Sequence, residues 1–397
     1  MFDTKLGHFL TYHHVAQKFF RDHRDKFDGL VIPLSVATVF QQGTGGFVLT
    51  LKKPYAVDPR TPIFQADFKR EKIRNALLEM AKAHGPSVES IFKKRPLAPA
   101  DFTEATIQEV AGHVLQFQKD FAKNSSEKVD KYAELLGEAS ANVYAGPNFL
   151  IPPYFRSKSR KDPWYTVSLD LAKAAVKCKE NHRLAPVLHF NPDFPEGDFS
   201  SILKDYSEKG FDGLIIFFNN LKEYELPAKA LSKYADLVCT LREKPLFGLF
   251  GGYFTLLLRK IGLPTFSNAV GYGEYRDSGY HSGGQAVRRY YVPALHRYFV
   301  DSQAQTLLDI VKEKWLRCTC SVCRKQPTIT DLTSQQLLEH FLNARMVEIK
   351  EAEQNTLGQL TAMLEATSQK LSGHGLLLIL EYTKHLRQWA IALEPFR

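Results

Sequence analysis

Short apolar segments alternate with longer helical segments between Phe27 and about Val300. This alternation is typical of a parallel sheet whose strands are joined by crossover helices. We expect strands at residues 29–37, 46–51, 55–58, 148–151, 184–190, 213–218, 237–240, 246–249 and 265–271. We expect helices at residues 67–84, 104–123, 126–138, 166–181, 199–209, 227–234 and 253–261.

About eight strand-and-helix units in roughly 250 residues favour an α/β fold of the (β/α)8 TIM-like barrel type. No glycine-rich dinucleotide motif follows any expected strand, which disfavours an open doubly wound sheet, although that sheet stays the alternative. Residues 67–146 read as a helical insertion in a barrel domain of residues 1–300. Residues 301–397 then form a helical appendage, with helices expected at 302–315, 334–356, 360–368 and 375–393.

The composition is that of a folded, soluble chain, since 44% of its 397 residues are hydrophobic and 24% are charged. No apolar run is long enough to cross a membrane, and the N-terminus lacks the order of a secretion signal, so we expect a cytoplasmic protein with no membrane partner. The formal net charge of +9 favours polyanionic partners without identifying one.

Three of the five cysteines, Cys318, Cys320 and Cys323, form a Cys-x-Cys-x2-Cys cluster. Thiolates at this spacing can bind one zinc ion, and His340 from a following helix can complete the tetrahedron. Four protein ligands leave no open position on the ion, so this zinc is expected to be structural.

Two alternatives to this zinc site stay open. The three thiols can simply be small buried residues, with His340 a histidine on a helix face. The fourth ligand can instead be His374, His296 or His281, if the appendage folds back on the barrel. Clustered thiols are otherwise avoided in a reducing compartment, which favours the metal site.

A barrel pattern that ends in this cluster and a later histidine resembles the tRNA-guanine transglycosylase superfamily, along the whole chain. The sequence KPLFGLFGGYFTLLLRKIGLPTF (244–266) resembles the glycine-rich strand and helix before that family's second catalytic aspartate. The sequence YAVDPRTPIFQ resembles its Asp-Ser-Gly-Gly-Phe-Gln motif, with Asp58, Phe64 and Gln65 matching and two residues added. The sequence VIPLSVATVF resembles its first barrel strand.

The chain also departs from that family. Pro-Arg-Thr-Pro follows Asp58 in place of Ser-Gly-Gly, and Ser267 and Asn268 stand where the second aspartate is expected. The sequences VDPRTPIFQ, NFLIPPYF, VGYGEYRDSGYHSGG and RRYYVPALHRYF most resemble the DNA-modifying branch, the DpdA-like transglycosylases. Those enzymes exchange guanine in DNA for a 7-deazaguanine.

Base exchange with retained stereochemistry needs a carboxylate that bonds to the sugar and a second group that transfers protons. The resemblance implies that Asp58, at the end of a barrel strand, contacts the base and transfers protons. The match for the nucleophile falls on Ser267, so we expect a nearby acid to act instead, Asp277 first and Glu274 second. The alternatives are a turn-initiating Asp58 before proline and a surface Asp277 neutralised by Arg276.

A guanine-like base needs stacking and hydrogen bonds in a pocket too narrow for duplex DNA, so the target nucleotide must be flipped out or single-stranded. The resemblance implies that Asn219 and Asn220 occupy the family's Gly-Gly base-contact position, and that Gln65 contacts the base. Aromatic residues at strand ends are stacking candidates, although burial in the core is their commoner fate: Phe64, Phe190, Tyr272 and Tyr275.

Exposed basic residues near the same end of the barrel are expected to contact the nucleic-acid backbone. These are Arg156, Lys158, Arg160 and Lys161, which follow the expected strand at 148–151, and Arg288 and Arg289, which precede Tyr290 and Tyr291. A solvated charged loop is the alternative.

The sequence therefore predicts a zinc-containing pentosyltransferase that exchanges guanine in DNA for 7-cyano-7-deazaguanine or a close relative. Its partners would be DNA, the free base and other proteins of a DNA-modification system. One alternative is a tRNA-guanine transglycosylase. Another is a catalytically silent nucleic-acid-binding relative, which the missing aspartate after Phe266 favours. A zinc-containing barrel that acts on a small metabolite is a weaker third.

Overall fold

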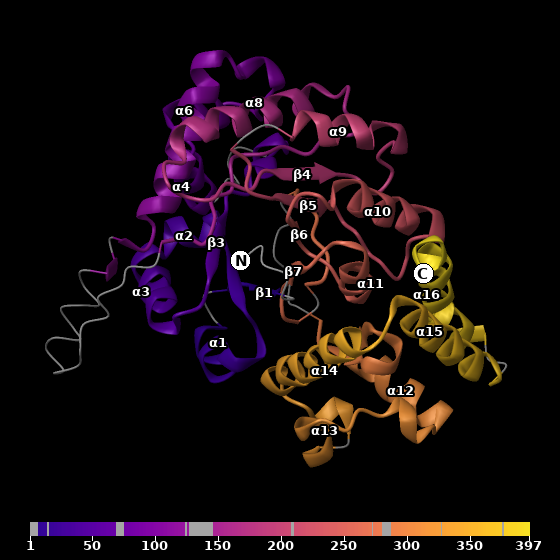
Figure 1. Ribbon diagram of the computed structural model, residues 1–397. Coiled ribbons are helices and arrows are strands. Elements are labelled where there is room, and N and C mark those ends of the chain that lie inside the picture. The colour runs from indigo at the N-terminus through magenta and orange to yellow at the C-terminus, as the bar shows by residue number, and fades with distance from the viewer. Residues whose placement is uncertain are drawn as a thin grey trace, which may run out of the picture.

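The computed structural model describes residues 7–13, 16–68, 75–123, 125–126, 146–207, 210–271, 273–279, 287–326, 328–374 and 377–397. At its centre is a seven-stranded sheet in the order β3-β2-β1-β7-β6-β5-β4, in which all neighbouring strands are parallel. The strands are β1 (Gly7–Thr11), β2 (Gly29–Pro33), β3 (Tyr55–Asp58), β4 (Val187–Phe190), β5 (Leu214–Phe218), β6 (Leu246–Gly248) and β7 (Thr265–Asn268). The fold is therefore α/β, with a parallel sheet that forms half of a barrel (Figure 1).

Side chains on each strand alternate between the two faces of the sheet. Phe9, Val31 and Ile215 belong to a small buried cluster on one face. Their neighbours Leu10 and Ile216 belong to the larger core, which also takes in the helices. Because both faces are covered, these strands have continuous apolar sequences, and this explains why most of them are recognisable without a structure.

Ten α-helices are described before the C-terminal part of the chain. They are α1 (Gln17–Asp22), α2 (Leu34–Val39), α3 (Gln41–Leu51), α4 (Asn75–Ala83), α5 (Pro86–Phe92), α6 (Glu104–Asp120), α8 (Pro163–Cys178), α9 (Phe199–Asp205), α10 (Ala228–Leu241) and α11 (Tyr253–Leu257). Helices α4, α5 and α6 lie between β3 and β4 in the chain, and α6 packs on α8 (Figure 1). Most of the helix expected at 126–138 lies outside the described residues.

Residues 148–151 are bonded to the backbone on both sides, although they form no named strand. The amide of Asn148 donates to the carbonyl of Tyr55 at 2.8 Å, and the amide of Ala185 donates to the carbonyl of Leu150 at 3.0 Å. Leu150 also forms an isolated parallel bridge with Leu184. The segment therefore lies between β3 and the chain leading into β4, which are the two ends of the sheet order.

Two expected strands are helical. Residues 46–51 lie in α3, where Thr44, Val48 and Leu51 are buried at helical spacing. Residues 237–240 lie in α10, whose buried face also includes Leu231 and Tyr234. A short apolar run does not distinguish a buried strand from the buried stripe of a helix, and here the longer helical period decides. Strand β1 was not expected, and it precedes the segment that resembles a first barrel strand.

The C-terminal part begins with an antiparallel hairpin that the sequence did not predict, β8 (Arg289–Val292) and β9 (Arg297–Val300). The helices α12 (Asp301–Val311), α13 (Ser321–Lys325), α14 (Ser334–Gln354), α15 (Leu357–Ser372) and α16 (Leu377–Leu393) follow. The hairpin packs on α12 and α14, while α16 packs on α15 and α10, so the appendage lies against the helices of the sheet (Figure 1). None of the helices within the described ranges combines the length and apolarity that crossing a membrane requires.

Candidate active site and metal centre

The predicted cysteines and histidine come together. One ligand atom from each of Cys318, Cys320, Cys323 and His340 lies within 4.8 Å of all the others. The Nδ1 atom of His340 is 3.3 Å from Sγ of Cys323 and 3.5 Å from Sγ of Cys320. Three sulfurs and one imidazole that converge in this way can hold a metal ion such as zinc. His340 is therefore the histidine of the cluster, as its spacing predicted.

Neighbouring groups fix the orientation of His340. Its Nε2 atom lies 2.6 Å from the carbonyl oxygen of Tyr291, so Nε2 carries the proton and Nδ1 presents its lone pair to the sulfurs. The ring of Tyr290 stacks on the imidazole at 4.2 Å, and its hydroxyl lies 3.3 Å from Sγ of Cys323. Tyr290 and Tyr291 thus support the metal cluster from strand β8.

Local capping places His340 on its helix. The hydroxyl of Thr333 accepts a hydrogen bond from the amide of Gln336 at 3.2 Å, and the side chain of Gln336 accepts one from the amide of Thr333 at 2.8 Å. This reciprocal pair satisfies two amides that the first turn of α14 would otherwise leave unpaired. The fixed start of α14 sets the direction in which His340 points.

Asp58 is the last residue of β3, and Pro59 ends the strand because it cannot donate to the ladder. Its side chain is only 2% exposed. The Oδ1 atom accepts hydrogen bonds from the hydroxyl of Tyr154 at 2.8 Å and from the amide of Arg60 at 3.1 Å. Burial raises the pKa of Asp58, and the opposing effects of Arg60, Tyr154 and Arg276 do not cancel it. Asp58 therefore holds a proton more readily than an exposed aspartate does.

A small cavity, the inner cavity, lies against Asp58. It is lined by Asp58, Arg60, Pro62, Tyr154, Phe217, Phe250, Arg276 and Ser278. Burial and the neighbouring Arg60 lower the pKa of Arg276 to about 9. Burial also lowers the pKa of Arg60, although Asp58 opposes the shift. The inner cavity thus combines one buried carboxyl with two half-buried guanidinium groups.

A second cavity of about 760 Å³, the outer cavity, shares Arg60 and Arg276 with the inner one. Its other polar lining includes Ser35 after β2, Asn220 after β5, and Asp277 beyond β7. These residues follow the carboxyl ends of parallel strands, where α/β proteins bind ligands. The volume is in the usual range for a small-molecule site, so the two cavities together are the candidate active site.

The segment 273–279 is tied to the end of β5. The amide of Ser278 donates to Oδ1 of Asn219 at 2.7 Å, and the amide of Asn220 donates to the carbonyl of Arg276 at 2.7 Å. The side-chain oxygen of Asn219 is therefore bonded to this segment, so its observed role is to position Arg276 and Asp277. Asn220 lines the outer cavity, as a base contact would.

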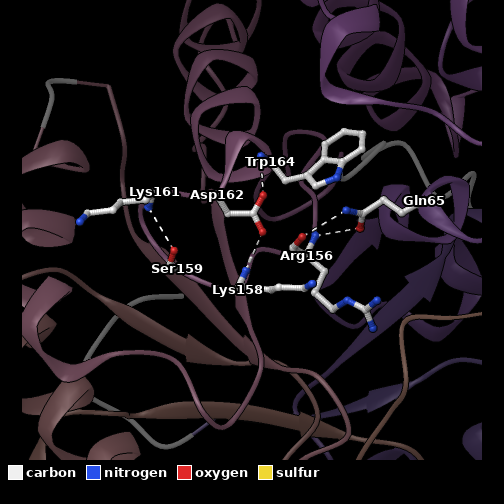
Figure 2. Close-up of a pocket in the computed structure, with 7 residues that line it drawn as sticks. All are labelled: Gln65, Arg156, Lys158, Ser159, Lys161, Asp162 and Trp164. Atoms are coloured by element: carbon white, nitrogen blue, oxygen red, sulfur yellow. Dashed lines mark hydrogen bonds between the residues drawn. The ribbon is translucent and has the colours of Figure 1, made fainter.

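Three residues predicted to bind the base are placed elsewhere. Both ends of the Gln65 amide bond to the backbone of Arg156, at 3.1 and 3.0 Å (Figure 2). Phe64 is fully buried against Phe92, with ring centroids 4.8 Å apart. Phe190 is likewise buried in the core. Phe64 and Phe190 fill the core because large aromatic groups gain most by leaving water.

Of the other stacking candidates, Tyr275 lines the outer cavity, beside Lys222, whose ammonium group lies 5.5 Å from the centre of the ring. Tyr272 and His281 lie outside the described residues. Tyr275 is therefore the predicted aromatic residue that the structure places at the candidate active site.

The acids beyond Phe266 differ sharply in position. Glu274 is buried and forms an ion pair with Arg345 of α14, and burial raises its pKa to about 8. Asp277 lines the outer cavity, where its Oδ1 atom accepts the amide of Gly279 at 2.8 Å. Ser267 is fully buried, and its hydroxyl accepts the amide of Phe250 at 3.3 Å. Asp277 is therefore better placed than Glu274 to meet a ligand.

Three of the predicted backbone contacts share one cavity. This basic cavity of about 520 Å³ is lined by Gln65, Arg156, Lys158, Ser159, Lys161, Asp162 and Trp164 (Figure 2). The Asp162 carboxylate accepts the amides of Lys158 at 2.9 Å and Trp164 at 3.1 Å, which shapes the turn before α8.

The other three predicted contacts are engaged elsewhere. Arg160 forms an ion pair with Asp205 at 2.7 Å. Arg288 pairs with Asp301 at 3.2 Å and donates to the carbonyl of Thr330, so it joins the hairpin to the appendage. Arg289 begins strand β8 of that hairpin. These arginines form bonds within the protein, so they are weaker candidates for contacts with nucleic acid.

Sequence reasoning missed Arg60, Tyr154 and Arg276 as residues of the site. The departure from the family motif was the available signal for Arg60, which lies in the Pro-Arg-Thr-Pro stretch that replaces Ser-Gly-Gly. Arg276 was considered only as a surface partner of Asp277. Tyr154 gave no signal of its own, because its contact with Asp58 joins residues that are far apart in the chain.

The fold and the site define an α/β protein with a Cys3His group that can hold a metal. No protein-family model and no curated protein matches the chain. Among solved structures, an intracellular xylanase from Thermoanaerobacterium saccharolyticum is similar over 72% of this chain and 91% of its own, with 7% sequence identity and a TM-score of 0.36. A likeness this weak carries no argument about activity.

Proposed function

We propose that the protein is a DNA guanine transglycosylase that replaces guanine with 7-cyano-7-deazaguanine or a close relative. The observation that carries this proposal is the position of Asp58. It is a buried carboxyl with a raised pKa, at the carboxyl end of a parallel strand. The cavity that it lines shares two arginines with the outer cavity, which Asp277 lines. Base exchange needs a proton donor and a nucleophilic carboxylate on one site.

The proposal includes a complete (β/α)8 barrel with a structural zinc ion. Residues 148–151 would act as the eighth strand, since they bond to β3 on one side and to the chain before β4 on the other. Phe149 and Ile151 belong to the same small buried cluster as Phe9 and Val31, which supports an interior that is closed on all sides. The Cys3His group would hold the appendage and take no part in the chemistry.

In the proposed reaction, a carboxylate oxygen of Asp277 attacks C1′ of the target deoxyribose while the bond from C1′ to N9 of guanine breaks. Asp58 gives its proton to N9 as guanine leaves. The incoming base then attacks C1′ through its own N9, which releases Asp277 and returns a proton to Asp58. Each half-reaction breaks one bond and forms one bond at C1′, so the two inversions retain the stereochemistry.

Two further features support a flipped or single-stranded DNA substrate. Tyr275 lies where a base in the outer cavity could stack on it. Arg156, Lys158 and Lys161 of the basic cavity come from the segment that follows Tyr154, near the candidate active site, and they suit phosphate groups of the strand. Other proteins of a DNA-modification system would open a duplex for the site.

The test is nucleoside analysis of both DNA and tRNA from cells that contain the protein and a supply of 7-deazaguanine. We expect the modified nucleoside in DNA, and its loss with Asp58→Asn and with Asp277→Asn. Asp309→Asn is the matched control, since it makes the same change in an exposed carboxylate that pairs with Arg317. Modification confined to tRNA would replace the DNA proposal with the tRNA alternative.

A catalytically silent nucleic-acid-binding protein is the second candidate. Ser267 favours it, because this buried hydroxyl stands where the resemblance expects a carboxylate. Incubation of the purified protein with labelled guanine and single-stranded DNA distinguishes the two. Incorporation of label excludes a silent protein, whereas DNA binding with no incorporation supports one.

A further inference from the structure

Two guanidinium groups face the same small space. Arg60 and Arg276 both line the inner cavity beside Asp58, and both also line the outer cavity. Arg60 follows β3 in a left-handed conformation, with φ of 53°, and Arg276 is carried by the segment tied to Asn219 and Asn220. Two separate parts of the chain are thus folded so that two like charges meet.

The protein supplies few partners for these charges. Nη1 of Arg60 donates to the hydroxyl of Ser35 at 3.2 Å, and the guanidinium of Arg276 lies 5.6 Å from the ring centre of Phe250. Within the described ranges, neither guanidinium forms an ion pair with a carboxylate. Asp58 accepts the backbone amide of Arg60 and not its guanidinium. A planar guanidinium group with N–H donors to spare is suited to bind an oxyanion through two parallel hydrogen bonds.

The charge of the cavity lining also favours binding of an anion. The inner cavity holds two guanidinium groups against a single carboxyl, Asp58. Asp277 adds a second carboxyl on the outer cavity, where it accepts the amide of Gly279. Lys222, at the rim, is paired with Glu225 at 3.1 Å. Bringing two cations together in a half-buried cavity costs free energy unless an anion joins them, and Asp58, the carboxyl of this cavity, forms no ion pair with either one.

We propose that Arg60 and Arg276 form an oxyanion site at the mouth of the active site. Its ligand is either the phosphodiester next to the flipped nucleotide or a carboxylate on the incoming base, and this choice of ligands rests on the proposed function. An oxyanion held here lies beside Asp58 and so places the sugar or the base within reach of that carboxyl. The site is distinct from the basic cavity of Arg156, Lys158 and Lys161.

Equilibrium binding to the full chain tests the site without requiring base exchange. The probes are inorganic phosphate, a guanine-containing single-stranded oligonucleotide, the same oligonucleotide with neutral methylphosphonates flanking the guanine, and 7-deazaguanine with either a cyano or a carboxylate group at position 7. The variants are Arg60→Gln, Arg276→Gln and the charge-preserving Arg276→Lys. Arg317→Gln is the matched control, because it removes one positive charge from an exposed pair with Asp309.

We expect each glutamine variant to weaken binding of one oxyanion probe by roughly 10-fold or more, the loss of a charge-assisted hydrogen bond, while Arg317→Gln stays within about twofold. Arg276→Lys should recover part of the affinity. A loss that disappears with the methylphosphonate strand identifies the phosphodiester as the ligand. A preference for the carboxylate base that the variants abolish identifies the base.

Unchanged binding of all the probes in correctly folded glutamine variants overturns the oxyanion site, whatever the exchange assay shows. Arginine-dependent binding in a protein that never incorporates labelled guanine retains the site and rejects the transglycosylase. Far-ultraviolet circular dichroism of each variant confirms the fold before binding is compared.

Discussion

Two charge clusters in this protein, one buried and one half-buried, have opposite ratios of arginine to carboxyl groups. Where the appendage meets the sheet, Arg345 is paired with two carboxylates, Glu274 and Glu348. At the mouth of the candidate active site, Asp58 faces two guanidinium groups, Arg60 and Arg276, and no ion pair forms among these described side chains. In the first cluster each carboxylate forms an ion pair with the arginine, whereas in the second neither guanidinium group forms an ion pair with the carboxyl. Charge that is ion-paired within the protein indicates a structural role, and cavity-lining charge without an ion pair indicates a ligand site.

The appendage cluster is also the more densely bonded. Oε1 of Glu348 accepts the hydroxyl of Tyr291 at 2.7 Å and lies 2.6 Å from Nδ1 of His296, while Oε2 lies 3.0 Å from Nη1 of Arg345. His296 is thus engaged with Glu348 and is not the fourth metal ligand. Because α14 carries His340, Arg345 and Glu348, the metal cluster and the charge cluster stabilise the same helix.

Metal removal should have the largest effect on stability. It loosens α14, the helix that carries both the metal ligand His340 and the paired charges Arg345 and Glu348. We expect one zinc ion per chain, and a loss of several kcal/mol or more of appendage stability on chelation, since structural zinc contributes roughly 10 kcal/mol or more in small domains. Mass spectrometry of the native protein measures the metal, and thermal unfolding with and without chelator measures the stability. Cys320→Ser and His340→Ala should reproduce the loss.

Cys239→Ser is the control for these variants, since Cys239 lies on α10 outside the cluster. It should keep the full metal content and the native unfolding temperature. If His340→Ala binds the metal with unchanged affinity, the assignment of the fourth ligand is wrong even if the cysteines bind zinc.

Loss of the central arginine should be the next largest effect. Arg345→Met leaves Glu274 and Glu348 buried without their cation, and we expect a loss of about 3–5 kcal/mol in the free energy of unfolding. Urea denaturation followed by tryptophan fluorescence measures it. The exposed pair of Arg397 and Glu365 offers a control, because Arg397→Met should change stability by at most about 1 kcal/mol. Equal effects of the two substitutions would show that the buried cluster is not structural.

More of the metal cluster than of the inner cavity could be predicted from the sequence. The physical reason is that the metal cluster is built from residues close together in the chain, and the inner cavity is not. Three thiols within six positions, followed by a capped helix with one histidine on its buried face, constrain one another locally. The inner cavity is assembled from chain segments that only the sheet brings together. The sequence could therefore suggest Asp58 as a candidate, but not its hydrogen bond to Tyr154 or the cavity that it shares with Arg276.

The same dependence on contacts between distant residues explains why some predicted strands and base contacts were wrong. Continuous apolar strands such as β5 were found because burial on both faces leaves a clear pattern. Helices α3 and α10 were partly misread because a few consecutive apolar residues fit either structure. Phe64 and Gln65 fit a family motif by residue type, but packing in the core and bonds to the backbone of Arg156 occupy their side chains.

Acid should lower the stability of the folded protein through His84, which bonds to the segment that carries Arg60. Nδ1 of His84 donates to the carbonyl of Met80 at 2.8 Å, and Nε2 accepts the hydroxyl of Thr61, next to Arg60, at 3.1 Å. Burial lowers the pKa of His84 from 6.5 to about 4, so the unfolded chain takes up the proton first. Its stability contribution is therefore present above pH 6.5 and is lost as the pH falls toward 4, by about 1.4 kcal/mol per pH unit.

His84→Gln isolates this effect from other titrating groups. The difference in unfolding free energy between the native protein and the variant should narrow by up to about 3 kcal/mol between pH 6.5 and pH 4. Urea denaturation at several pH values provides the measurement. A constant difference across that range would mean that His84 is not held neutral in the folded protein.

The smallest effect on stability should come from replacing Arg276 in the inner cavity. This substitution is compared directly with Arg345→Met. Arg276→Met removes a half-buried cation that repels Arg60 and has no ion pair with a described carboxylate. We therefore expect the free energy of unfolding to change by about 1 kcal/mol or less in either direction. The same urea titration used for Arg345→Met measures it, in a buffer without phosphate or sulfate. Addition of phosphate should then stabilise the native protein more than the variant, because only the native protein has both guanidinium groups to bind it. A loss of 3 kcal/mol or more without any anion present would place Arg276 in the same class as Arg345, as a structural charge whose partner lies within the protein.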